Sequence, residues 1–68
     1  MKKENTGAYG FSGCWSAQIV VNNIVYALNT YDSKIVAEEE VRYACQLRQA
    51  GWSGLKIQAK INSYTNNN

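Results

Sequence analysis

The sequence predicts an α+β fold: a three-stranded antiparallel sheet packed on one helix, with an additional C-terminal strand (β-β-β-α-β). Two runs of alternating apolar and polar residues flank Asn22-Asn23, and such alternation is typical of half-buried strands. After Asp32 the apolar residues recur at helical spacing, and residues 55–61 alternate once more. A chain of 68 residues with these elements is expected to form one small domain.

Three strands are expected before the helix. The first covers residues 8–11 and is followed by a turn or bulge signal at Ser12-Gly13. The second covers residues 14–21 and the third residues 24–30. Asn22-Asn23 joins them as a two-residue hairpin, because asparagine tolerates the positive φ that a type I′ turn requires at both positions.

The length of this turn sets the register of the sheet. A two-residue turn pairs Val21 with Ile24, so that both side chains lie on the same face. The buried face is then expected to carry a mainly apolar set: Trp15, Ala17, Ile19, Val21, Ile24, Tyr26, Leu28 and Thr30. The open face is expected to carry an uncharged set: Ser16, Gln18, Val20, Val25, Ala27, Asn29 and Tyr31. Trp15 is the largest side chain of the buried set, and we expect it at the centre of the core.

The helix is expected to begin at an N-cap of Asp32 or Ser33 and to run to about Gln49. Its apolar stripe is formed by Val36, Ala37, Val41, Ala44 and Leu47, with Glu40 and Arg48 close beside it. Gly51 is expected to end the helix in the left-handed conformation, and Trp52 to fold back onto Leu47.

Residues 55–61 alternate without a break and are expected to form the last strand. Lys56 and Lys60 then lie on one face of it, where positive charge protects an edge strand from pairing with other chains. They are also the paired cations best placed to meet a phosphate. The expected domain covers residues 8–61, between a flexible N-terminus of residues 1–7 and a polar tail of residues 62–68.

Absences from the composition argue against catalysis. The sequence has no histidine, which removes His-based acid–base, nucleophile-activating and metal schemes together. Cys14 and Cys45 are too few for a four-ligand zinc site and are expected to be reduced thiols. The glutamates at positions 38–40 fan out around a helix rather than converge on one substrate. We therefore expect no enzyme, no metal and no cofactor.

The expected location is the cytoplasm. No apolar run approaches the roughly 18 residues needed to span a bilayer, so we expect no membrane contact. Lys2-Lys3 is followed by polar residues rather than by the apolar stretch of a secretory signal.

Three short motifs follow one another over about residues 9–50. Trp15-Ser16-Ala17-Gln18-Ile19 reads W-x-A-x-I, and a tight hairpin separates it from Leu28-Asn29-Thr30-Tyr31-Asp32-Ser33 and the acidic helix start Ala37-Glu38-Glu39-Glu40. In this order they resemble the plant ethylene-response-factor type of DNA-binding domain, which also occurs in phage homing endonucleases and integrases. That family reads W-x-A-x-I, a Gly-containing turn, L-G-T-F-D-T and an E-E-A-rich helix, and Lys34-Ile35-Val36 looks like an insertion into it. The resemblance implies DNA contact through the open sheet face, made by arginines and tryptophans from all three strands.

The charge of the expected open face departs from that family. No Lys, Arg, Asp or Glu occurs from Asn5 through Tyr31, so the face lacks the cations that supply most nonspecific affinity for nucleic acid. The net charge of +2 is also too small to indicate a polyanion partner. An uncharged face with valines and an Asn and Gln rim is typical of the centre of a protein interface.

We therefore expect a small non-enzymatic binding module that acts by protein–protein contact through its uncharged sheet face. Its size and its hairpin-plus-helix build are similar in outline to phage or mobile-element inhibitors of host defence, anti-CRISPR proteins included. The expected partner is a host protein or a protein–nucleic acid complex, and a homodimer is a further candidate. The alternative is a DNA-binding domain of the ethylene-response-factor or integrase type, with Lys56 and Lys60 at the phosphates. Tyr9, Phe11 and Tyr31 could stack on bases or anchor a protein partner.

Overall fold

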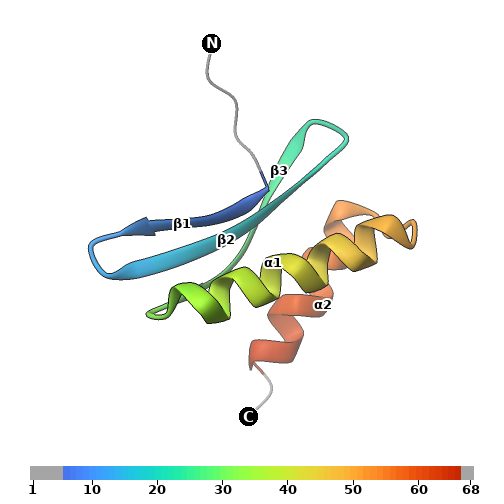
Figure 1. Ribbon diagram of the computed structural model, residues 1–68. Helices are drawn as coiled ribbons and strands as arrows, with labels where there is room; N and C mark the ends of the chain where they lie inside the picture. Colours follow the sequence, from blue (N-terminus) through green and yellow to red (C-terminus); the bar gives the residue numbers. More distant parts are fainter. Residues whose placement is uncertain (1–5, 67–68) are drawn as a thin grey trace.

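A computed structural model describes residues 6–66 of the chain, with side chains through residue 63. It contains five elements: β1 (Gly7–Phe11), β2 (Cys14–Val21), β3 (Ile24–Tyr31), α1 (Lys34–Gln49) and α2 (Gly54–Asn66). The three strands form one antiparallel sheet in the order β1-β2-β3. Figure 1 shows the sheet as one layer and the helices as the second, with α1 running across it. The prediction of an α+β fold with this sheet is confirmed, whereas the C-terminal strand is wrong.

Both hairpins close with two-residue turns in the left-handed region. Asn22 and Asn23 have φ of 55° and 68°, which confirms the type I′ turn predicted for this pair. Ser12 and Gly13 have φ of 54° and 81° and join β1 to β2 in the same way. The first turn therefore places Phe11 opposite Cys14 at the end of the β1–β2 ladder.

A bulge in β3 changes the faces that the sequence predicts. Ser16 pairs with Thr30, but Gln18 pairs with Ala27, so β3 carries one residue more than β2 over this interval. Side chains alternate with a period of two, and one extra residue moves all that follow to the other face. Thr30 thus lies on the open face beside Ser16, and Asn29 and Tyr31 are turned to the helix side.

The ends of α1 are as the sequence predicts. Ser33 is the N-cap, and its hydroxyl accepts a hydrogen bond from the Val36 amide at 3.4 Å. At the other end the Trp52 amide donates to the Leu47 carbonyl at 3.1 Å, and the Gly51 amide to Arg48 at 3.0 Å. With Gly51 at φ 95° this is a Schellman motif, which satisfies carbonyls that the helix leaves free.

Residues 54–66 form the helix α2, and this corrects the strand predicted for residues 55–61. Ser53 caps the helix, its hydroxyl accepting from the Lys56 amide at 3.2 Å. Ile57 and Ile61, four residues apart and so on one helical face, are buried, while Leu55 is 68% exposed. Apolar and polar residues do alternate over residues 55–61, but only Ile57 and Ile61, which a helix places on one face, are packed in the core. The helix also extends to Asn66, through most of the segment expected to be a polar tail.

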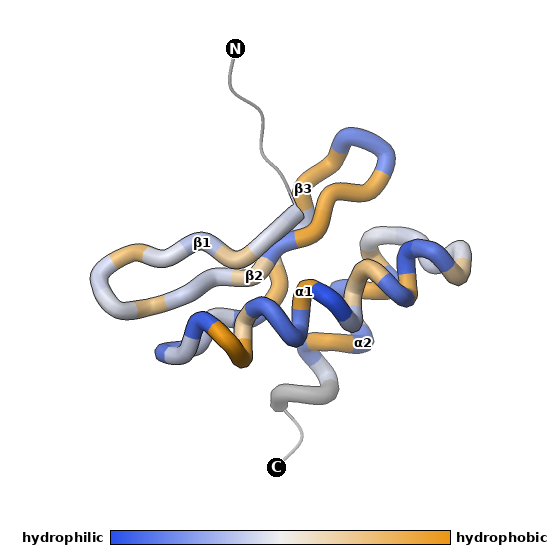
Figure 2. The backbone as a smooth tube through the Cα atoms, in the orientation of Figure 1, coloured by the Kyte–Doolittle hydropathy of each residue, from blue (hydrophilic) through white to orange (hydrophobic). Residues whose placement is uncertain are grey.

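The core lies between β2 and the two helices. Its buried members are Ile19, Val21, Ala44, Ile57 and Ile61, with Tyr26, Leu28, Cys45, Leu47 and Trp52 packed against them. Figure 2 shows the most hydrophobic stretches of the sheet beside the second half of α1 and the start of α2, while β1 is paler. Trp15 faces the helices as predicted but is only partly buried and is not among the core residues. It covers Gly10, whose backbone its ring contacts on the neighbouring strand.

Candidate functional site

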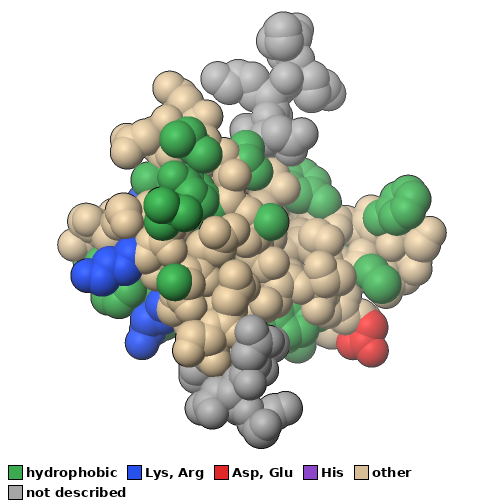
Figure 3. Space-filling model, turned by 180° about the vertical axis from the view of Figure 1, so that it is seen from behind, with side chains coloured by type: hydrophobic (Ala, Val, Ile, Leu, Met, Phe, Trp, Pro, Cys, Tyr) green, Lys and Arg blue, Asp and Glu red, His purple; other side chains and the backbone are tan. Residues whose placement is uncertain are grey.

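The open face of the sheet carries no charged side chain. Its members follow from the strand pairings and come from all three strands: Gly7, Tyr9 and Phe11 of β1, Cys14, Ser16, Gln18 and Val20 of β2, and Val25, Ala27 and Thr30 of β3. Figure 3 shows the molecule from behind the view of Figure 1, and Lys, Arg, Asp and Glu lie only at the margins of that view. Both helices pack on the opposite face, so neither of them covers this one.

Apolar side chains on this face are exposed to solvent. Phe11 is 83% exposed, Tyr9 43% and Val25 40%. Ser16 and Thr30 share a hydrogen bond of 3.2 Å between their hydroxyls, which satisfies part of their polar capacity within the face. The surface is therefore apolar and weakly polar without an ionic group, the composition typical of an interface centre.

The structure sorts the residues predicted for partner binding into two groups. Ser16, Gln18, Val20, Val25 and Ala27 lie together on the open face. Asn29 and Tyr31 do not, because of the β3 bulge. The Asn29 amide donates to Glu40 Oε2 at 2.7 Å and to the Ile61 carbonyl at 3.3 Å, so it joins the sheet to both helices.

The open face also includes β1, which the predicted surface leaves out. Tyr9 and Phe11 are predicted as candidate aromatic anchors, but without assignment to a face. The signal was present in Ser12-Gly13: a two-residue turn places Phe11 opposite Cys14 and hence Tyr9 opposite Ser16. This register places the side chains of Tyr9 and Phe11 on the open face, which therefore extends over all three strands.

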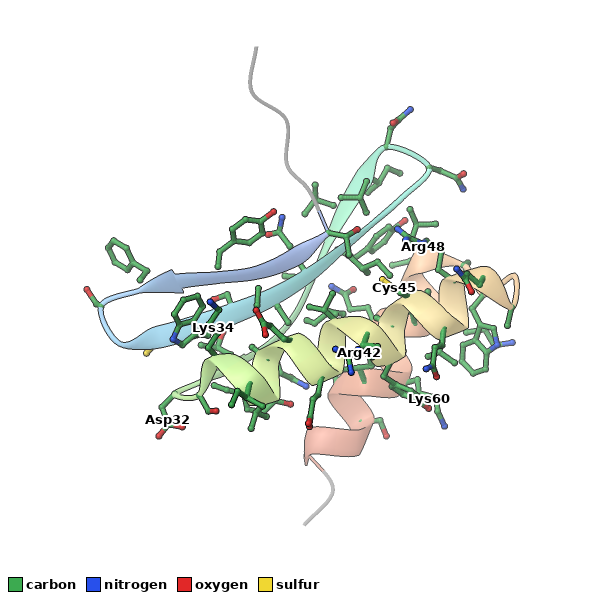
Figure 4. All side chains as sticks on the ribbon, viewed as in Figure 1. Asp32, Lys34, Arg42, Cys45, Arg48 and Lys60 are labelled. Atoms are coloured by element: carbon green, nitrogen blue, oxygen red, sulfur yellow. The ribbon has the colours of Figure 1, made fainter. Side chains whose placement is uncertain are left out.

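The lysines proposed for phosphate contact lie elsewhere. Lys56 and Lys60 belong to α2 rather than to a strand, and both are exposed. The Lys56 ammonium lies 4.9 Å from the centre of the Trp52 ring, and Lys34 lies 5.4 Å from that of Trp15, distances that suit cation–π interaction. Figure 4 shows Arg42 and Lys60 on the helix layer and Arg48 directed towards the sheet.

Chemically reactive groups are few in the described part of the chain. Both cysteines are free, Cys14 exposed and Cys45 partly buried. No three His, Cys, Asp or Glu side chains among residues 6–63 are grouped so that they could hold a metal ion. Within the described residues neither helix is long and apolar enough to cross a membrane. On the open face the exposed groups are apolar side chains, hydroxyls and the Cys14 thiol.

Comparison with protein families, with characterised proteins and with solved structures finds no match to this chain.

Proposed function

We propose that this chain is a small non-enzymatic binding module that holds a partner protein through the open face of its sheet. The observation that carries the proposal is the combination of exposure and neutrality on one face. Tyr9, Phe11 and Val25 are exposed there, and no ionic side chain interrupts them. Aromatic residues are enriched and charged ones depleted at the centres of protein interfaces.

The partner is proposed to be a host protein or a protein–nucleic acid complex, and the role to be inhibition by occupying a surface. Such inhibition asks nothing more of the inhibitor than a stable, complementary face. The similarity in outline to phage or mobile-element inhibitors of host defence is an analogy of size and build, and it motivates the proposal rather than supporting it independently.

DNA binding of the ethylene-response-factor or integrase type is the second candidate. It is favoured by one observation, the antiparallel order β1-β2-β3 followed by a helix packed on a single face, which leaves the other face free. Against it stands the neutrality of that free face, because phosphate contacts by Lys and Arg supply most nonspecific affinity. Lys56 and Lys60 lie on α2, which packs on the other face of the sheet, rather than among the residues of the open face.

A substitution at Val25 distinguishes the two candidates. Val25→Lys places a cation on the open face, and an unpaired charge in a contact that excludes water is strongly unfavourable. A bait carrying Val25→Lys is expected to lose its protein partner from a bacterial lysate, by about tenfold or more in recovered protein. Val20→Glu is expected to do the same. Nuclease treatment of the lysate is expected to leave capture by the unmodified protein unchanged.

The matched control is Ile24→Lys, a neighbouring position on β3 whose side chain is 54% exposed but faces the helix side. It is expected to keep the partner, and equal unfolding midpoints verify that all variants are folded. Fluorescence titration with duplex and single-stranded DNA at two salt concentrations completes the test. Capture abolished by nuclease, with DNA affinity raised by Val25→Lys and falling steeply with salt, would replace the protein partner by DNA.

A further inference from the structure

A cavity of about 410 Å³ lies on the helix side of the molecule, between the end of β3, α1 and α2. It is lined by Tyr31, Val36, Glu39, Glu40, Tyr43 and Ile61. Four of these residues, at positions 36, 39, 40 and 43, share one face of α1 by helical spacing. The volume is within the range of about 300–1,000 Å³ usual for ligand pockets.

One carboxylate oxygen at this cavity is left without a partner. Glu40 Oε2 accepts the Asn29 amide at 2.7 Å. Its other oxygen, Oε1, is shielded from solvent and has no hydrogen-bond partner. A buried acceptor without a donor is costly, and because Oε1 is also closed to solvent, a donor in the cavity reaches it only after the Glu40 side chain turns.

The remaining lining of the cavity defines what that donor should be. Glu39 adds a second carboxylate, and among the described residues no Lys or Arg forms an ion pair with Glu39 or Glu40. Tyr31 and Tyr43 contribute aromatic rings, which attract cations. Val36 and Ile61 provide apolar wall. Two acids, two aromatic rings and an apolar wall are complementary to a cation carried on an apolar stem.

We propose that this cavity receives a lysine or arginine side chain from a partner polypeptide. A polypeptide suits it better than a free amine because the apolar surface continues beyond the cavity along α1. Ile35, which is next to Val36 in the chain and is not part of the lining, is 68% exposed, and the lining residues Val36 and Tyr43 are themselves 41% and 39% exposed. Residues flanking the cation would cover this surface, which a small amine leaves in water. The inference is independent of the open face, from which the cavity is separated by the sheet.

The test is a titration followed in amide NMR spectra, with the peptide acetyl-Gly-Leu-Lys-Leu-Gly-amide as the probe. The expected result is saturable shifts at residues 36–43 and a Kd below about 10 mM. The same peptide with norleucine in place of lysine, which keeps the stem and removes the ammonium, is expected to bind about tenfold more weakly. Butylammonium, which keeps the cation and lacks the flanking residues, is also expected to bind about tenfold more weakly.

Glu40→Gln and Glu39→Gln test the acids, with Glu38→Gln, an exposed position of the same helix, as the matched control. Each cavity variant is expected to weaken binding of the lysine peptide by about threefold to tenfold, and the control variant to leave it unchanged. Because Glu39 is exposed, its variant reports on binding even if Glu40→Gln loosens the fold. Equal affinity for the lysine and norleucine peptides, or no effect of either cavity variant, would show that the cavity does not recognise a cation. Butylammonium binding as tightly as the lysine peptide would show that no polypeptide is needed. Absence of shifts at a peptide concentration of about 10 mM would overturn the whole proposal.

Discussion

Two charged residues of α1 join the helix layer to the sheet. In the sequence, Glu40 and Arg48 lie beside the apolar stripe of the helix, where charged residues are not expected. In the structure the Arg48 guanidinium donates to the Val20 carbonyl at 2.8 Å and to the Thr6 hydroxyl at 3.3 Å. The last β1–β2 pair is Gly7 with Gln18, so Val20 lies beyond the strand that would otherwise bond it. Arg48 and Thr6 take the place of that strand.

Both contacts are made by Nη1 of Arg48, while Nη2 lies 3.7 Å from Cys45 Sγ. Arg48→Lys keeps the charge but replaces the planar guanidinium that reaches all three groups by a single ammonium on a different stem. We expect the free energy of unfolding to fall by about 1–2 kcal/mol, since the Val20 carbonyl loses a charge-assisted donor. The same substitution at Arg42, an exposed residue of the same helix, is expected to stay within about 0.5 kcal/mol. Urea denaturation followed by tryptophan fluorescence measures both. Equal effects at the two positions would mean that the Arg48 contacts contribute no stability.

The parts of the fold that the sequence predicts well are those determined by neighbouring residues. The turn at Asn22-Asn23, the cap at Ser33 and the helix end at Gly51 depend on residue types next to one another. The sequence predicts the turn and the helix end, and it places the cap at Asp32 or Ser33. The local sequence does not decide the structure of α2, because the short run of residues 55–61 is compatible with both a strand and a helix. Ser53 was the missing signal, a capping residue immediately before the apolar run.

Gly54 tests how closely α2 approaches the sheet. A Cβ at this position would overlap the ring of Tyr26 on β3. Gly54→Ala raises helix propensity by up to about 1 kcal/mol, but overpacking against the ring costs about 1–3 kcal/mol. We expect a net loss of unfolding free energy and a displaced Tyr26 ring, seen as shifted aromatic NMR signals.

Gly7→Ala is the matched control, because the nearest atoms that a Cβ would meet there belong to the Tyr9 side chain, at an ordinary 3.5 Å or more. It is expected to be neutral or slightly stabilising, since the alanine narrows the unfolded ensemble. A Gly54→Ala protein that gains stability as Gly7→Ala does would show that α2 lies further from β3 than the structure places it.

At the scale of the whole molecule, one sheet serves two surfaces of different chemistry. The neutral open face could be predicted in large part from alternation and turn length, which correctly place five of its residues: Ser16, Gln18, Val20, Val25 and Ala27. The positions of Asn29 and Tyr31 could not be, because a bulge is a property of paired strands rather than of either strand alone. The cavity on the helix side was beyond prediction for a related reason: Ile61 reaches it only if residues 54–66 are helical.

Leu55 and Ile57 provide a test of the whole architecture by two substitutions on one element. In a strand their side chains would share a face, whereas in a helix they point about 200° apart. The structure buries Ile57 completely and leaves Leu55 68% exposed. Ile57→Ala is therefore expected to cost about 2–5 kcal/mol.

Domains of this size seldom have more than about 3–5 kcal/mol of total stability. Loss of Ile57 from a core shared by β2, α1 and α2 is thus expected to unfold most of the protein, with collapsed NMR dispersion and no cooperative urea transition. Leu55→Ala is expected to remain folded, within about 1 kcal/mol of the unmodified protein. Comparable losses at both positions would favour a fourth strand with both side chains inside. A large loss at Ile57 alone requires the helix, and with it the cavity that α2 closes.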